Sequence, residues 1–99
     1  MLCMYIMDPI IFELQQECCE QLSLGNDVFV IISIGQVTNL PPTFSVKVAA
    51  VEDKKLIVKG CLPQSTSSAK QAEIWAKNIS KVDPRIRIHT DGLISTYPS

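Results

Sequence analysis

The stretch VFVIISI at residues 28–34 decides the fold. Six of its seven residues are apolar, and most of them are β-branched, which favours an extended strand. A strand that is apolar on both sides has both of its faces covered. We therefore expect residues 28–34 to lie in the middle of the fold or beside a partner.

Two further strands are expected after a loop at residues 35–43. Apolar residues alternate with others over residues 44–49, which is typical of a strand with one buried face. A turn at residues 52–55 leads back into a strand at residues 56–60. The short turn predicts that these two strands form a hairpin.

A helix is expected before the first strand. Asp8 is the expected N-cap and Pro9 the first helical residue, because both residue types favour those positions. The apolar residues of this segment then recur at helical spacing: Ile11, Leu14, Cys18 and Leu22. Gly25-Asn26-Asp27 is expected to end the helix.

A second helix is expected after residues 63–65. Ser65 is the expected N-cap, and three alternative caps follow it: Thr66, Ser67 and Ser68. An apolar stripe of small residues would let this helix lie close to a sheet: Ala69, Ala72, Ala76 and Ile79. Trp75 falls on the flank of that stripe, and Pro84 stops the helix. Residues 85–90 alternate like a short strand.

The expected order is therefore α-β-β-β-α in the α+β class. Short connections require the three strands to form an antiparallel sheet, and the two helices then cover one face of it. We expect one domain at residues 8–82, with an N-terminal extension at 1–7 and a C-terminal extension at 83–99.

Charge is distributed unevenly along the 99 residues, although the net charge is only −1. Residues 1–27 hold no Lys or Arg, and they hold five acids: Asp8, Glu13, Glu17, Glu20 and Asp27. All nine basic residues lie in residues 28–99. A phosphate-binding surface is therefore expected in the second part of the chain.

The four cysteines and the single His89 do not have the spacing of a zinc site. We expect free thiols in a reducing compartment, nuclear or cytoplasmic, and no metal or other cofactor. The apolar start is too short for a signal peptide or a membrane span. No set of residues indicates catalysis, so we expect no enzyme and no catalytic residue.

The element order resembles that of the double-stranded RNA-binding domain, and two stretches carry this resemblance. Residues 39–48, NLPPTFSVKV, look like the second loop of that family and its following strand. Residues 60–76 contain STSSAKQA, which looks like the start of the final helix of the family, where lysines are usual. The copy is divergent, and it is similar to domains of plant Dicer-like proteins and of Dicer-partner proteins.

The resemblance implies three regions that would contact an RNA duplex. They are Glu13 and Gln16 on the first helix, Asn39 in the loop, and Thr66, Ser67 and Lys70 at the second helix. The family's usual histidine in the loop is replaced by Leu40, and only Lys70 remains of its three lysines. We therefore expect weakened RNA binding.

Two functions remain open. The first is a protein-interaction module for dimerisation or for a Dicer-like partner, with Trp75, Ile86 and Ile88 as the expected contact residues. The second is a functional, sequence-independent domain that binds double-stranded RNA. Under the first, the partner is another protein with such a domain or a Dicer-like protein, and no membrane is involved.

Overall fold

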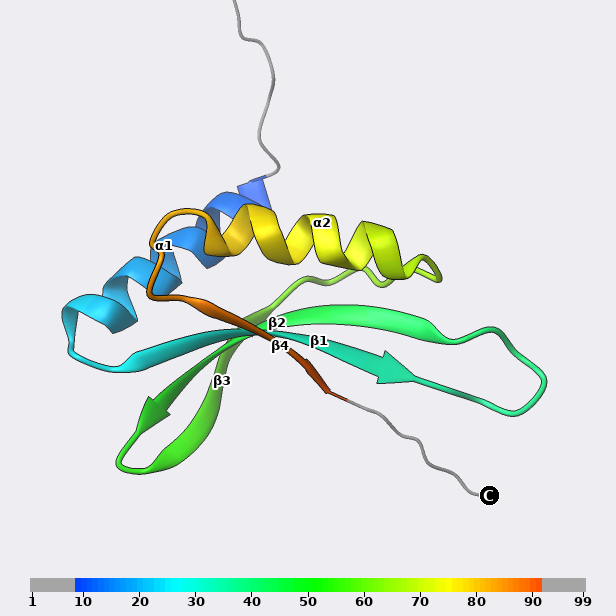
Figure 1. Ribbon diagram of the computed structural model, residues 1–99, viewed down its shortest axis with the longest axis horizontal. Coiled ribbons are helices and arrows are strands. Elements are labelled where there is room, and N and C mark those ends of the chain that lie inside the picture. The colour runs from blue at the N-terminus through cyan, green and yellow to red at the C-terminus, as the bar shows by residue number, and fades with distance from the viewer. Residues whose placement is uncertain (1–8, 92–99) are drawn as a thin grey trace, which may run out of the picture.

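The computed structural model describes residues 9–91 and shows an α+β fold with two helices and a four-stranded mixed sheet (Figure 1). In chain order the elements are α1 (Pro9–Ser23), β1 (Asp27–Gly35), β2 (Thr43–Glu52), β3 (Lys55–Cys61), α2 (Ala69–Ser80) and β4 (Arg87–Asp91). The expected N-cap at Asp8, the extension at 1–7 and the tail from residue 92 onward lie outside the described residues.

Strand β1 lies inside the sheet, as its sequence predicts. The strand order is β3-β2-β1-β4, and β1 pairs antiparallel with β2 and parallel with β4. Val28, Val30 and Ile32 face the helices, and Ile31 on the opposite face is also buried. On this opposite face Phe29 and Ser33 are partly exposed, so β1 is buried on the helix side and only partly buried on the other.

The expected sheet of three antiparallel strands is incomplete, because β4 adds a fourth, parallel strand within the segment expected as a C-terminal extension. Helix α2 carries the chain back across the sheet, so the next strand runs in the direction of β3 and β1. Strand β4 then pairs with the edge of β1 that β2 leaves open. All five residues of β4 are exposed, so the one-sided apolar pattern of a buried strand is missing.

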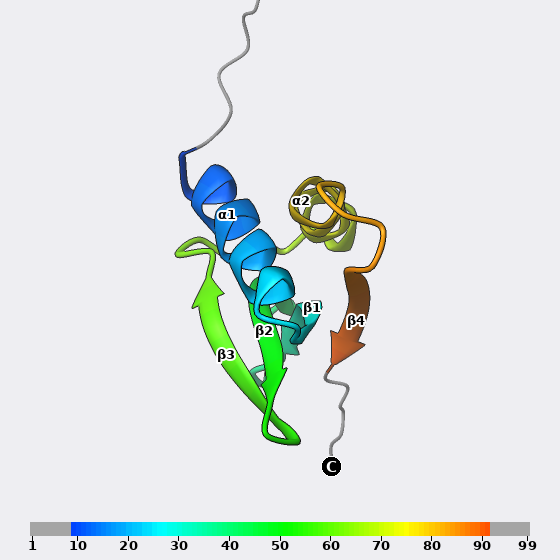
Figure 2. The same ribbon diagram turned by 90° about the vertical axis from the view of Figure 1, so that its left-hand side faces the viewer.

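Both helices pack on one face of the sheet, as expected (Figures 1 and 2). Ala72, Ala76 and Ile79 of α2 are fully buried, so small side chains do bring this helix close to the strands. A Cβ atom at Gly60 would lie 2.9 Å from Cδ2 of Leu14, which shows how closely α1 approaches β3. Gln15 of α1 donates a hydrogen bond of 2.7 Å to the backbone carbonyl of Asn78, and this bond joins the two helices.

The turn between α2 and β4 is held by Asp83. Its carboxylate accepts hydrogen bonds from the backbone N–H and the guanidinium group of Arg85, at 2.8 to 3.0 Å. These bonds, with the guanidinium contributing most, lower the pKa of Asp83 from 3.8 to about 2. Because the folded-state pKa is the lower one, the carboxylate stabilises the fold above about pH 4, and this contribution is lost as the pH falls toward 2.

We predict that Ile86, which directly precedes β4, contributes strongly to stability, because it belongs to the core and is 7% exposed. Replacing Ile86→Ala should lower the free energy of unfolding by about 2–4 kcal/mol, because it removes a buried side chain and leaves a cavity. The control Ile88→Ala removes a side chain that is 39% exposed, and it should cost under about 1 kcal/mol in dilute solution. Urea denaturation of both variants measures the difference, and equal losses would contradict this prediction.

Candidate functional site

The residues expected to contact phosphates gather at the start of α2. Ser68 is the N-cap, and its hydroxyl accepts a hydrogen bond from the backbone N–H of Gln71 at 3.1 Å. The Thr66 hydroxyl accepts from the backbone N–H of Ser68, and its backbone pairs with Phe44 of β2. Thr66 therefore serves the local turn, whereas Ser67 and Lys70 are exposed.

Asn39 is exposed in the loop between β1 and β2, where it makes a turn. Its φ of 69° lies in the left-handed region that asparagine tolerates better than most residues. The backbone N–H of Leu40 closes the turn by donating to the carbonyl of Val37 at 3.0 Å. The conformation of this turn is therefore sufficient to explain why an asparagine stands at position 39.

Glu13 and Gln16 are exposed on α1, on either side of Gln15. Since Gln15 bonds to Asn78, this part of α1 meets α2 about 12 Å along that helix from Lys70, at 1.5 Å per residue. The structure thus places Ser67 and Lys70 together, with the β1–β2 loop at the same end of the sheet, and it leaves Glu13 and Gln16 on another element.

Carboxylates neutralise part of the basic surface. Within residues 9–91, three of the nine basic side chains pair with acids: Lys59 with Glu52 at 2.6 Å, Lys77 with Glu73 at 4.0 Å, and Arg85 with Asp83 at 2.8 Å. Each of these pairs would have to open, or hold its acid near the phosphate, when the cation binds a nucleic acid. This arrangement disfavours a strong polyanion site.

The three expected partner contacts differ in exposure. Trp75 is partly buried and packs against the core, and Ile86 belongs to the core. Ile88 keeps 39% of its surface exposed on β4. Among these three residues, Ile88 has the largest exposed fraction.

Sequence reasoning missed the apolar outer strand β3. Leu56 and Val58 are 56% and 53% exposed, and Ile57 between them is also exposed. Strand β3 ends the sheet, so one of its edges has no partner strand within residues 9–91. The sequence signal for this surface was the apolar triplet LIV at residues 56–58. A strand with one face in water is expected to alternate apolar and polar residues instead.

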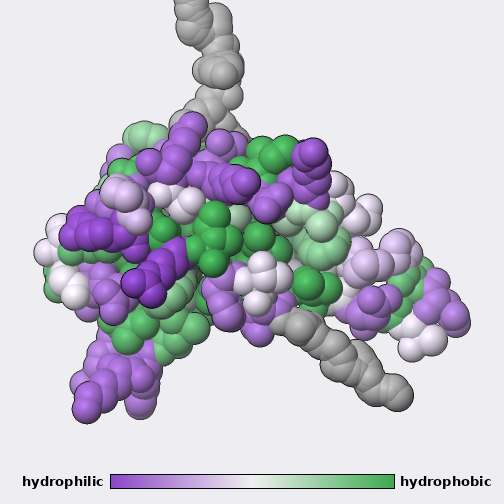
Figure 3. All heavy atoms as spheres, in the orientation of Figure 1, coloured by the Kyte–Doolittle hydropathy of each residue, from purple (hydrophilic) through white to green (hydrophobic). Residues whose placement is uncertain are grey.

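The turn that leads into β3 has two central residues, Asp53 and Lys54, with φ of 54° and 66°. Two such residues in a tight hairpin indicate a type I′ turn, whose twist matches that of the strands. The hairpin projects from the body of the molecule in Figure 1, and its tip is hydrophilic in Figure 3. The apolar part of β3 therefore lies between a charged tip and the core.

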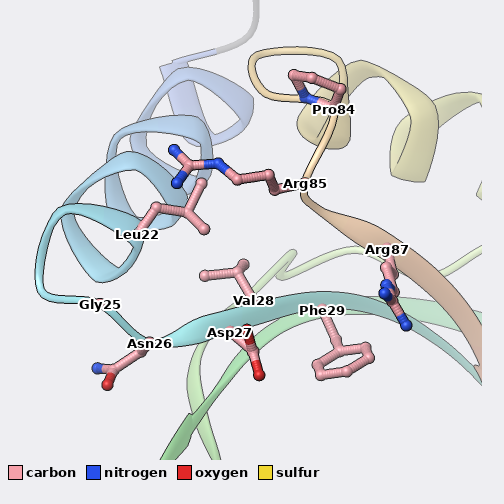
Figure 4. A pocket seen from close by; sticks show the side chains of 9 residues that line it. All are labelled: Leu22, Gly25, Asn26, Asp27, Val28, Phe29, Pro84, Arg85 and Arg87. Atoms are coloured by element: carbon pink, nitrogen blue, oxygen red, sulfur yellow. The ribbon is translucent and has the colours of Figure 1, made fainter.

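The face of the sheet opposite the helices continues the apolar surface of β3. Directly paired residues point to the same face, and the registers align Val58, Ala49, Phe29 and Arg87 in one row across all four strands. Figure 4 shows Phe29 and Arg87 on this side of the sheet. This row is thus apolar at β3 and ends in the cation Arg87 at β4.

A hollow of about 380 Å³ lies where α1 meets β1 and the turn before β4 (Figure 4). Arg85 and Asp27 line it together with the apolar Leu22 and Val28. Arg85 is already paired with Asp83, and the lining includes no nucleophile beside a base.

Within residues 9–91, no group of three His, Cys, Asp or Glu side chains comes close enough to hold a metal ion. The two helices of this part of the chain are also too short or too polar to cross a membrane. Cys18 is fully buried, as its place in the helical pattern predicts, whereas Cys19 and Cys61 are exposed free thiols.

Comparisons with known proteins give no relative. No protein-family model, no curated protein and no solved structure matched this chain.

We predict that the cysteines differ strongly in reactivity. Burial raises the pKa of the Cys18 thiol to about 12, and the neighbouring Cys19 and Glu17 add to the shift. Since the thiolate is the reactive form, iodoacetamide at pH 8 should modify Cys18 at least about 100-fold more slowly than the exposed Cys19. Peptide mass spectrometry measures both rates in one sample, and similar rates in the folded protein would contradict the packing of α1.

Proposed function

We propose that this chain is a non-catalytic protein-interaction module that binds an extended segment of a partner along β3. The observation that carries the proposal is the exposed apolar triplet Leu56, Ile57 and Val58 on a strand with one edge unpaired within residues 9–91. An unpaired strand edge offers N–H and C=O groups to an incoming strand, and these supply affinity. Apolar side chains beside that edge supply the buried area.

The chemistry of β3 defines the segment that fits it. Alternate residues of an added strand point to opposite faces, so they would meet Leu56 and Val58 on one side and Ile57 on the other. Lys54 and Lys55 lie exposed at the turn end of β3. A fitting partner segment is therefore extended and apolar, with acidic residues where it passes this turn.

The resemblance to double-stranded RNA-binding domains supports a partner of the RNA-silencing machinery, either a Dicer-like protein or another protein with such a domain. Divergent members of that family act in protein contacts. Weak RNA binding is consistent with the pairing of Lys59, Lys77 and Arg85 to carboxylates and with the single Lys70 at the start of α2.

We predict that selection from displayed random peptides of about 12 residues, long enough to pair with one strand, yields binders with alternating apolar residues. Val58→Lys should weaken their binding by at least about tenfold, because a charge would replace apolar contact at the edge. Leu24→Lys is the matched control, since Leu24 is exposed outside β3. Biolayer interferometry measures the affinities.

A selection without enriched peptides would contradict the proposal. Equal weakening by Val58→Lys and Leu24→Lys would also contradict it, because binding would then not depend on β3.

The alternative is a functional double-stranded RNA-binding domain, which the grouping of Ser67 and Lys70 at the start of α2 favours. For an RNA duplex of about 20 base pairs we expect binding that saturates only at low salt, because few phosphate contacts remain. Lys70→Ala should then reduce the affinity several-fold, and the control Lys54→Ala on the hairpin turn should change it less. Fluorescence anisotropy at two salt concentrations measures this.

Tight binding at physiological salt that Lys70→Ala abolishes would favour the alternative function.

A further inference from the structure

The opposite edge of the sheet has a charge pattern that complements itself. Strand β4 lies at the end of the sheet, and its outer edge has no partner strand within residues 9–91. Arg87, His89 and Asp91 pair with Phe29, Ile31 and Ser33, so all three point to the face without helices. In the described part of the chain, neither Arg87 nor Asp91 has an ion-pair partner.

We propose that two copies of this chain associate through β4, antiparallel, with the two-fold axis at His89. The two sheets then join into one continuous sheet, and each Arg87 lies opposite Asp91 of the second copy. Opposite charges in directly paired positions stabilise a strand pair, and the symmetry supplies this pair twice. This association goes beyond the proposed function, because it uses the edge opposite β3.

The same register also matches apolar surface on the helix side. It places Ile88 of each copy opposite Thr90 of the other copy. Thr90 lines a hollow of about 410 Å³ between α2 and the sheet, whose apolar wall includes Ile32, Ile34 and Phe44. Figure 3, in which β4 is on the near side, shows hydrophobic residues exposed across the middle of the molecule. Ile88, which is 39% exposed, would therefore be buried against the hollow of the second copy.

Other registers lose this complementarity. An axis at Ile88 pairs Arg87 with His89 and leaves Asp91 beyond the partner strand, and an axis at Thr90 pairs His89 with Asp91 and leaves Arg87 without a partner. Parallel in-register pairing sets Arg87 against Arg87 and Asp91 against Asp91, which is destabilising. The antiparallel register centred on His89 satisfies both charges of each copy.

The first test is sedimentation velocity of the full chain from about 10 µM to about 1 mM, because a short strand pair buries little area and binds weakly. The wild type should dimerise within this range. Arg87→Asp sets acid against acid, and Asp91→Arg sets base against base, so each change should raise the dissociation constant by about tenfold or more. Both positions are exposed, and circular dichroism verifies that the variants fold.

The second test mixes the two variants. An equimolar mixture of Arg87→Asp and Asp91→Arg chains places two acids opposite two bases, so it should form a heterodimer near the wild-type affinity. The double variant, with both changes in one chain, should again pair with itself. A general loss of stability in the single variants would give neither rescue.

The inference is overturned if the wild type stays monomeric at the highest concentration, or if folded single variants dimerise like the wild type, or if neither rescue occurs. Val58→Lys separates the two proposals, because it should leave β4 association unchanged. If Val58→Lys abolished self-association and the charge reversals did not, the dimer would form through β3. That outcome would refute the β4 register and leave the proposed function standing.

Discussion

The structure depends on β1, which is paired along both of its edges and covered by the two helices on one face. Strand β2 binds one edge in antiparallel orientation and β4 binds the other in parallel. Valine and isoleucine on the helix side of β1 pack against α1 and α2, while Ile31 is buried on the other side. The two neighbouring strands and the two helices thus surround β1 on both edges and on one face.

The position of α2 follows from this constraint. Fully buried Ala72 and Ala76 let the helix axis lie close to the strands, and Gln15 ties it to α1. Once α2 has crossed the sheet, the turn held by Asp83 and Arg85 sends the chain down the remaining edge of β1. The sheet therefore ends in two exposed strands of different character: β3 is apolar and β4 is charged. Such a difference lets each edge favour its own kind of partner.

The sequence predicted the central strand, the hairpin, both helices and their common face, because each rests on a local apolar pattern with a capping or turn residue beside it. The pairing of β4 was not predictable in this way, since the contact that places it joins residues about sixty positions apart. The cap of α2 at Ser68 was one of four consecutive hydroxyl residues, which local preference alone cannot separate. The exposed β3 edge was missed because an apolar triplet is normally interpreted as buried. Only the strand order shows that β3 lies at the end of the sheet.

The parallel pairing of β4 has a consequence for the aggregation of the chain. Residues 28–34 combine high β-propensity with no charge and no proline, which is the composition of segments that assemble into fibrils. Strand β4 pairs with one long edge of that segment through five exposed residues, of which the first, Arg87, and the last, Asp91, are charged. Opening of β4 would uncover one edge of that segment. Pairing with β4 thus keeps one edge of residues 28–34 unavailable to an incoming strand, and a chain without β4 is expected to aggregate more readily.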